Sequence, residues 1–78
     1  MSKVTIYSTP TCTYCNAAKE FFKENKIAYE AVDVASDVVR RKEMIEKSGQ
    51  MGVPVILVDD ELIVGFDRTK LARILGIS

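Results

Sequence analysis

Histidine and tryptophan are absent from the 78-residue chain, and cysteine occurs only twice, at Cys12 and Cys15. A structural zinc site needs about four ligands, usually cysteine or histidine side chains. Two thiols without a histidine or a second cysteine pair do not supply that set, so an internal zinc site is nearly excluded. Glycine and proline are scarce as well, with four and two copies, and 47% of the residues are hydrophobic. Such a composition is typical of a folded globular protein.

The chain also lacks an excess of either charge. Eleven basic residues balance eleven acidic ones, which argues against nucleic acid, anionic lipid or a strongly acidic substrate as a partner. The only basic cluster, residues 40–42, is followed directly by Glu43 and Glu46. Mixed charges at this spacing are typical of a solvated helix face.

Long apolar runs are missing too. The longest, residues 53–58, is far too short to span a bilayer, and the first residues, MSKVTIYS, contain no stretch of signal-peptide length. We therefore expect a soluble cytoplasmic protein that forms a single domain over residues 1–78. In that reducing compartment a permanent disulfide is unfavourable, so the two cysteines indicate metal binding or redox chemistry.

The hydrophobic periodicity alternates between strand and helix patterns. Pro10 ends the first strand, Ser36 and Asp37 offer an N-cap and a first-turn acid for the second helix, and Gly49 ends that helix. Asp67 caps the last helix, and Gly76 lies just past its end. The expected elements are a strand at 4–8, a helix at about 13–25, a strand at 28–34, a helix ending at 49, a strand at 53–58, a turn at 59–61, a strand at 62–64 and a final helix. This order, βαβαββα, predicts an α/β fold with a four-stranded mixed sheet and three flanking helices.

Cys12 and Cys15 form a CxxC pair between the first strand and the first helix. A disulfide across so short a loop removes little entropy from the unfolded chain, so a purely structural role is weak. If Cys12 lies at the helix start, unpaired N–H groups of residues 13–15 and the helix dipole favour its thiolate. The nearest cation, Lys19, is almost two turns away, so the backbone must supply most of this effect. Cys12 is then the nucleophile, and the more buried Cys15 resolves the mixed disulfide.

Pro54 begins the most apolar strand, although proline has no N–H to donate to a sheet. Proline tolerates only the first position or the edge of a strand. A cis Val53-Pro54 bond would turn the chain sharply and leave the Val53 backbone free to pair with an extended substrate. A trans bond that merely starts a strand is much commoner, and the residues alone leave both forms open.

The chain resembles the glutaredoxin family over nearly its full length, in the first strand, the CTYC motif, the later GVP and the GFD before the last helix. Short bacterial glutaredoxin-like redoxins are the most similar members. The resemblance implies a thioredoxin-like fold, Cys12 as attacking thiol, Cys15 as resolving thiol and a cis Pro54. It also implies that the glutathione cysteinyl backbone pairs with Val53, and that the γ-glutamyl end lies near Gly65, Phe66 and Asp67. Asp67 is expected both to cap the helix and to bind.

Tyr14 lies between the cysteines, where family members usually have an aromatic residue. It could pack on the helix start, but an exposed ring beside a reactive sulfur favours contact with the substrate.

Several positions depart from the glutathione-using pattern. Thr9 replaces a common lysine, Met51 and Gly52 replace an arginine and a threonine, and Val64-Gly65 replaces Gly-Gly. Each change removes polarity or charge, and a charge-assisted contact contributes roughly 1.5 to 3 kcal/mol. The departures make a thioredoxin-reductase-like flavoenzyme an alternative to glutathione as the electron donor.

The first functional hypothesis is a monomeric thiol-disulfide oxidoreductase that reduces protein disulfides or glutathione mixed disulfides, with no permanently bound cofactor and glutathione as reductant or co-substrate. The alternative is a dimer that binds a two-iron, two-sulfur cluster through Cys12 and two glutathiones. A third is a protein-docking module in which the thiols are incidental.

Overall fold

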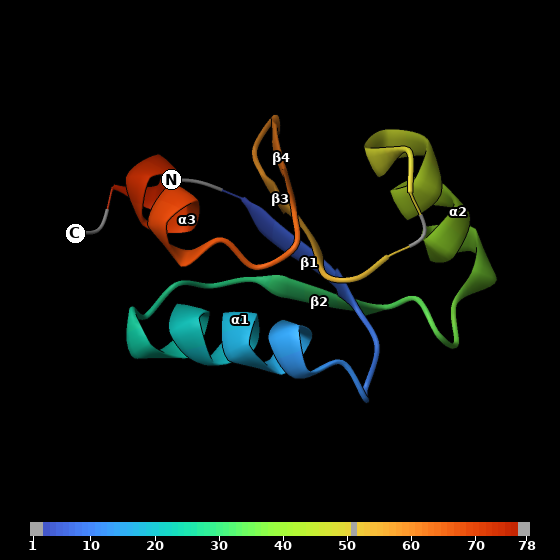
Figure 1. Ribbon diagram of the computed structural model, residues 1–78, viewed down its shortest axis with the longest axis horizontal. Helices are drawn as coiled ribbons and strands as arrows, with labels where there is room; N and C mark the ends of the chain where they lie inside the picture. The colour runs from blue at the N-terminus through green and yellow to red at the C-terminus, as the bar shows by residue number, and fades with distance from the viewer. Residues whose placement is uncertain (1–2, 51, 77–78) are drawn as a thin grey trace.

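A computed structural model describes residues 3–50 and 52–76. The chain forms seven elements in the expected order (Figure 1). They are β1 (Val4–Ser8), α1 (Thr13–Glu24), β2 (Glu30–Asp33), α2 (Val38–Ser48), β3 (Val55–Val58), β4 (Glu61–Val64) and α3 (Arg68–Leu75). Within the described ranges there is no helix with the length and apolar character that crossing a membrane requires.

The four strands form one mixed sheet in the order β2-β1-β3-β4. β1 runs parallel to β2 and antiparallel to β3, and β3 runs antiparallel to β4. A parallel neighbour requires a crossover connection, which α1 supplies, whereas β3 and β4 are joined by a tight turn. The mixed four-stranded sheet with three helices is therefore confirmed.

Alternation along the strands sends side chains to two separate cores. On one face, the α1 residues Ala18, Phe21 and Phe22 pack with Leu71 of α3 against β1, β3 and β4. On the other, Met44 of α2 packs against Tyr7 and its neighbours on β2 and β3. The sheet is thus a middle layer, with α1 and α3 on one side and α2 on the other (Figure 1).

Several element boundaries differ from the expectation. β2 starts at Glu30 rather than residue 28, because Lys26 adopts a positive φ of 56° and the N–H of Ile27 donates to the Phe22 carbonyl at 2.8 Å. β3 starts at Val55, after a cis Val53-Pro54 bond. Glu61 pairs with Val58 and belongs to β4, so the turn is shorter than expected.

The helix caps are mostly as expected, with one correction. Asp37, not Ser36, is the N-cap of α2, and it accepts a hydrogen bond from the Arg40 N–H at 3.0 Å. Asp37 is therefore no first-turn acid. Gly49 and Gly76 end α2 and α3 in the left-handed conformation with φ of 73°, which glycine adopts without the strain that a Cβ brings.

Candidate active site

The candidate site residues lie at one end of the sheet because of how the strands pair. Ser8 pairs with Asp33, Tyr7 with Val55, and Val55 with Val64. The C-terminal ends of β1, β2 and β4 and the N-terminal end of β3 therefore lie at the same end of the sheet. The segments adjoining these strand ends, residues 9–12, 34–37, 53–54 and 65–67, gather at this edge (Figure 1). The pairing thus places the CxxC loop, the cis-proline and the loop before α3 at the same end.

Cys12 is the N-cap of α1. Its backbone is extended, with φ of −80° and ψ of 114°, and its sulfur accepts a hydrogen bond from the Cys15 N–H at 3.2 Å. Its own N–H donates to the Thr9 carbonyl at 3.3 Å, which closes a turn before the helix. The sulfur thus occupies the position where a capping oxygen normally satisfies an amide of the first turn.

The two cysteines form a disulfide, with Cα atoms 5.1 Å apart. Cys15 lies one turn inside α1 and is completely buried, whereas Cys12 is half-buried. The structure therefore shows the oxidised pair, with one sulfur within reach of solvent and the other beneath it. Cys15 is thus the more buried of the two cysteines, as the sequence predicted.

Val53 and Pro54 lie beside the strand ends. The bond between them is cis, so the form implied by the family resemblance is confirmed. Pro54 is buried, and its carbonyl accepts a hydrogen bond from the Gly65 N–H at 2.8 Å. Among residues 3–50 and 52–76, neither the N–H nor the C=O of Val53 has a backbone hydrogen-bond partner. Val53 therefore retains two groups that an extended ligand can pair with.

The loop after β4 has largely structural contacts. Gly65 adopts a φ of 86°, and its N–H is already used by Pro54. The Phe66 ring packs edge-on against Phe21 of α1, with ring centroids 6.0 Å apart. Asp67 caps α3 by accepting from the Lys70 N–H at 3.0 Å, so its expected capping role is confirmed.

Tyr14, which lies between the two cysteines in the sequence, is 67% exposed. Packing on the helix start does not bury it, so its ring is available to a ligand. Of the departures from the glutathione-using pattern, Thr9 is half-buried, Gly52 and Val64 are exposed, and Met51 lies outside the described residues.

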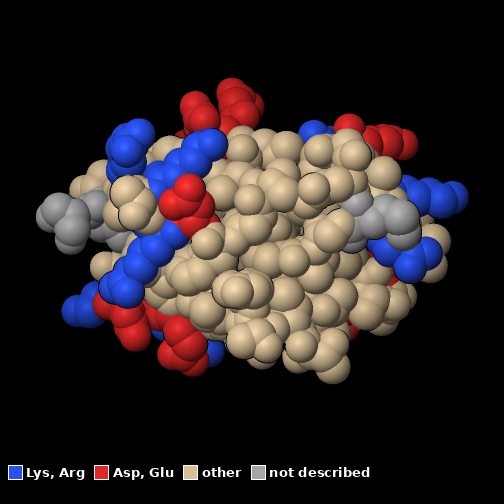
Figure 2. All heavy atoms as spheres, in the orientation of Figure 1, with Lys and Arg blue, Asp and Glu red and all other residues tan. Residues whose placement is uncertain are grey.

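Charge is sparse in the CxxC loop and its strand neighbours, although exposed Asp33, Asp37 and Asp67 lie at the same end of the sheet. The segments 4–18, 48–58 and 62–66 contain no Lys, Arg, Asp or Glu. Figure 2 shows the result as a broad uncharged area over the N-terminal half of α1, with charged side chains gathered toward α3 on one side and α2 on the other. The surface beside the cysteines therefore offers few partners for a charged ligand.

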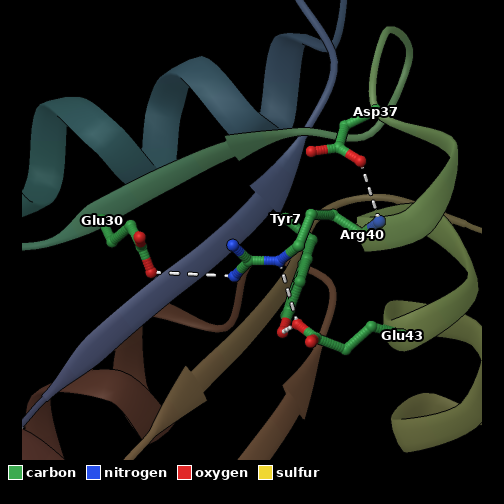
Figure 3. Close-up of polar contacts among 5 residues, drawn as sticks. All are labelled: Tyr7, Glu30, Asp37, Arg40 and Glu43. Atoms are coloured by element: carbon green, nitrogen blue, oxygen red, sulfur yellow. Dashed lines mark hydrogen bonds and ion pairs between the residues drawn. The ribbon is translucent and has the colours of Figure 1, made fainter.

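Sequence reasoning missed a polar network under α2. The Tyr7 hydroxyl donates to a Glu43 carboxylate oxygen at 2.6 Å, and Arg40 Nε donates to the same oxygen at 3.1 Å (Figure 3). Arg40 also lies 3.7 Å from Glu30 on β2, and its guanidinium is 5.9 Å from the Tyr7 ring centroid. Arg40 thus ties α2 to two strands and is not merely part of a solvated face. Its spacing to Glu43 was visible in the sequence, but its contact with Tyr7 depends on the fold.

The network shifts the ionisation of its members. Burial, assisted by the hydrogen bond to Glu43, raises the pKa of the Tyr7 phenol. The hydrogen bond from Tyr7, assisted by the positive charges of Arg40 and Lys47, lowers the pKa of the Glu43 carboxyl. The charged form of Glu43 is therefore stabilised in the folded protein.

The elements follow the order βαβαββα, with a cysteine pair at the start of the first helix and a cis-proline at the same end of the sheet. This combination defines a redox protein of the thioredoxin-like fold. The glutaredoxin family model matches residues 4–63, and the chain belongs to the glutaredoxin family.

Three relatives are glutaredoxins or glutaredoxin-like proteins, in agreement with this family. An uncharacterized glutaredoxin-like 8.6 kDa protein in the rubredoxin operon of Clostridium pasteurianum is 43% identical over 72 residues, covering 92% of this chain and 96% of that protein. Glutaredoxin 3 of Escherichia coli K12 is 34% identical over 67 residues, covering 86% and 81%. The glutaredoxin-like protein NrdH of Lactococcus lactis strain IL1403 is 32% identical over 74 residues, covering 91% and 97%.

Solved structures share the fold. A mutant of the thioredoxin-like protein BC3987 superposes with a TM-score of 0.92 at 35% identity, covering all of both chains. NrdH-redoxin from Escherichia coli superposes with a TM-score of 0.78 at 25% identity, covering 91% of this chain and 92% of that one. Together with the CxxC pair, these relationships make the protein a thiol-disulfide oxidoreductase that acts on disulfide substrates and is reduced again by a partner.

Proposed function

We propose that in this exchange Cys12 attacks the substrate disulfide and Cys15 resolves the mixed disulfide that results. The observation that carries the proposal is the position of Cys12 as the N-cap of α1, half-buried, with the Cys15 N–H donating to its sulfur. In the reduced protein the same amide and the helix dipole stabilise a Cys12 thiolate. Cys15 is fully buried, and that environment keeps its proton in place until a mixed disulfide forms above it.

The exchange then balances in two steps. The Cys12 thiolate attacks one substrate sulfur, the Cys12-to-substrate bond forms, and the released substrate thiolate takes a proton. Cys15 gives up its proton and attacks the Cys12 sulfur, which forms the Cys12–Cys15 disulfide and releases the second substrate thiol. The substrate gains two electrons and two protons, and the protein ends in the oxidised form seen here.

A trapping experiment tests this order. Cys15→Ser should accumulate a mixed disulfide with a disulfide-containing protein, because nothing remains to attack the Cys12 sulfur. Cys12→Ser, the matched control, should form none. Non-reducing electrophoresis and mass spectrometry of the adducts give the readout. Adducts on Cys12→Ser, or none on Cys15→Ser, would reverse or remove the assigned roles.

For ligand contacts, we propose that the free Val53 backbone groups pair with the backbone of an extended substrate or of glutathione beside Pro54. The exposed Tyr14 ring contacts the same ligand, and the γ-glutamyl end of glutathione lies near Gly65, Phe66 and Asp67. Because the Gly65 N–H already donates to Pro54, and because Phe66 packs on Phe21, that end is bound through other backbone atoms of the loop and through Asp67.

For electron donors, we propose that both glutathione and a thioredoxin-reductase-like flavoenzyme reduce the pair, in the cytoplasm, with the protein acting as a single-domain monomer. The glutaredoxin relatives support the first donor, and the reported thioredoxin-like activity profile of the E. coli NrdH-redoxin supports the second. The uncharged surface around the site favours the flavoenzyme, since it offers few charged groups to the carboxylates of glutathione.

A coupled assay with NADPH oxidation as the readout separates these donors. One arm contains glutathione and glutathione reductase, the other a bacterial thioredoxin reductase, and both use the same protein disulfide. Turnover is expected in both arms. Turnover only with the flavoenzyme would remove the glutathione proposal, and turnover in neither would overturn the proposed electron supply.

A further inference from the structure

Tyr7 is a buried tyrosine whose hydroxyl takes no part in the exchange described above. The residue is 1% exposed, and its hydroxyl donates to a Glu43 carboxylate oxygen at 2.6 Å. Burying a hydroxyl costs free energy, and phenylalanine would fill nearly the same volume without that cost. Burial alone therefore does not account for the hydroxyl group.

This hydroxyl joins the sheet to α2, a helix that buries few residues of its own. Among the residues of α2 only Met44 is fully buried, and Ile45 is partly buried against the same core. Hydrophobic contacts have no preferred direction, whereas a hydrogen bond requires a narrow range of distance and angle. Arg40 Nε donates to the same Glu43 oxygen and holds it in place (Figure 3). The bond from Tyr7 to Glu43 therefore fixes the orientation in which α2 packs on the sheet.

The orientation of α2 reaches the cis-proline segment by two routes. Residues 49–52 connect the end of the helix directly to Val53. The Val53 side chain also packs against the core cluster that contains Tyr7 and Met44. Tyr7 itself pairs with Val55, two residues after Val53. A rotation of α2 would therefore displace or loosen Val53.

The backbone of Val53 has few contacts that fix it otherwise. Its N–H and C=O have no backbone hydrogen-bond partner in the described part of the chain. The cis bond to Pro54 holds Val53 on one side, and the connection to α2 holds it on the other. Two groups that pair with one extended ligand must keep a fixed orientation, since ordering them at the moment of binding lowers affinity.

We propose that Tyr7 is a positioning residue whose hydroxyl, through Glu43, fixes α2 and thereby the Val53 backbone that pairs with an extended disulfide substrate. The inference rests on the proposed exchange and on the proposed Val53 contact. It names the substrate class that depends on this contact, which is a disulfide within a peptide chain. A small disulfide without peptide groups reacts at Cys12 without using Val53.

Two single variants test the positioning role. Tyr7→Phe removes only the hydroxyl, and Glu43→Ala removes its acceptor. Reduced protein is mixed with insulin, a peptide disulfide, or with bis(2-hydroxyethyl) disulfide, which has no peptide group. Acid quenching, thiol alkylation and mass spectrometry then give the rate at which the Cys12–Cys15 disulfide forms. We expect each variant to raise the half-saturating insulin concentration about threefold to tenfold with an unchanged limiting rate, and to react normally with the small disulfide.

The double variant Tyr7→Phe/Glu43→Ala should behave like either single variant, because all three lose the same bond. Glu46→Ala is the matched control, since it removes an exposed acid from the same helix, and it should change nothing. Val58→Ala creates a cavity at the far end of β3 and lowers stability alone. An unchanged half-saturating concentration in both single variants, an equal loss with both disulfides, additive effects in the double variant or the same rise in Val58→Ala would each overturn the positioning role.

Hydrogen exchange at Val53 separates a failure of this role from a failure of the ligand contact. In Cys15→Ser carrying glutathione as a mixed disulfide on Cys12, exchange of the Val53 N–H, followed by NMR, should be slow. Adding Tyr7→Phe should speed it severalfold. Slow exchange in both proteins would overturn the positioning role alone, whereas fast exchange with Tyr7 intact would overturn the Val53 contact and the role that rests on it. Wild-type protein inert toward both disulfides would overturn the exchange itself.

Discussion

At the scale of single residues, the two cysteines differ because of where α1 begins. Cys12 occupies the N-cap, where its sulfur meets an amide of the first turn, and Cys15 lies under it with no exposed surface. The same residue type three positions apart thus has two environments, one suited to a thiolate and the other to a protonated thiol. A one-residue shift of the helix start would remove that difference.

The ionisation of Glu43 depends on the fold. Its folded pKa is lowered, first by the Tyr7 hydrogen bond, so it adds stability above its unfolded pKa of about 4.3 and loses it as pH falls through the folded value. Since the Glu43 side chain is 38% exposed, solvent reduces the effect. We expect Glu43→Gln to lower the free energy of unfolding by about 0.5–1 kcal/mol at pH 7 and by much less toward pH 3.

Urea denaturation of wild type and variant at both pH values measures this difference. Glu46→Gln, an exposed acid on the same helix, is the control and should change little at either pH. A Glu43→Gln difference that is equal at pH 7 and pH 3 would show that the carboxylate charge is not what Tyr7 stabilises.

At the scale of elements, each helix starts with a side chain that accepts an amide of its first turn. Cys12, Asp37 and Asp67 accept from Cys15, Arg40 and Lys70 respectively. The three caps share one geometry but differ in chemistry, because a sulfur at this position is a weak acceptor and a reactive group whereas a carboxylate is a strong acceptor. The CxxC helix therefore starts with a weaker cap, and that cap is a thiol group able to react.

Asp67 allows its two roles to be separated. Asp67→Ala should lower the free energy of unfolding by about 1 kcal/mol, because α3 loses its cap, whereas Asp67→Asn should keep most of it because Asn is an equally good cap. If the carboxylate also binds the glutathione ammonium group, Asp67→Asn should raise KM for glutathione without lowering stability. Urea denaturation and the coupled assay give the two readouts. Equal stability of wild type and Asp67→Ala would contradict the capping role, and an unchanged KM in Asp67→Asn would contradict the binding role.

At the scale of the whole molecule, one core supports the active end. Phe22 of α1 is fully buried and packs with Phe21 and Tyr29, with ring centroids 6.0 and 5.3 Å away. This core holds α1 against the sheet, and α1 carries both cysteines. A chain of this size has a free energy of unfolding of roughly 4–12 kcal/mol, so a single large cavity removes a substantial share of it.

Phe22→Ala should lower the free energy of unfolding by about 3–5 kcal/mol. The variant loses the transfer free energy of the buried ring, and the cavity left behind removes packing contacts from its neighbours. Phe22→Leu, the control that keeps an apolar side chain and much of the volume, should cost clearly less. Thermal and urea denaturation of the reduced proteins measure both. A loss well below this range in Phe22→Ala would show that α1 does not depend on the ring for its packing.

Local sequence patterns determined the order of the elements, the Asp67 cap, the glycines that end α2 and α3, and the position of the cysteine pair at a helix start. These features follow from neighbours within a few residues, so periodicity and capping chemistry suffice. The starts of β2 and β3 were not predicted: the positive φ of Lys26 delays β2 until Glu30, and β3 starts only at Val55, after Pro54, whose carbonyl accepts from Gly65 on another segment.

The strand pairing, by contrast, was decided only in the tertiary structure. It brings Pro54 and Gly65 to the CxxC end, and it places Arg40 and Glu43 over Tyr7, which is more than thirty residues away in sequence. Such contacts join segments that are far apart along the chain, and no periodicity within a segment records which strand lies next to which. The residues themselves dictate the chemistry of the two thiols, while the packing of the sheet dictates what surrounds them.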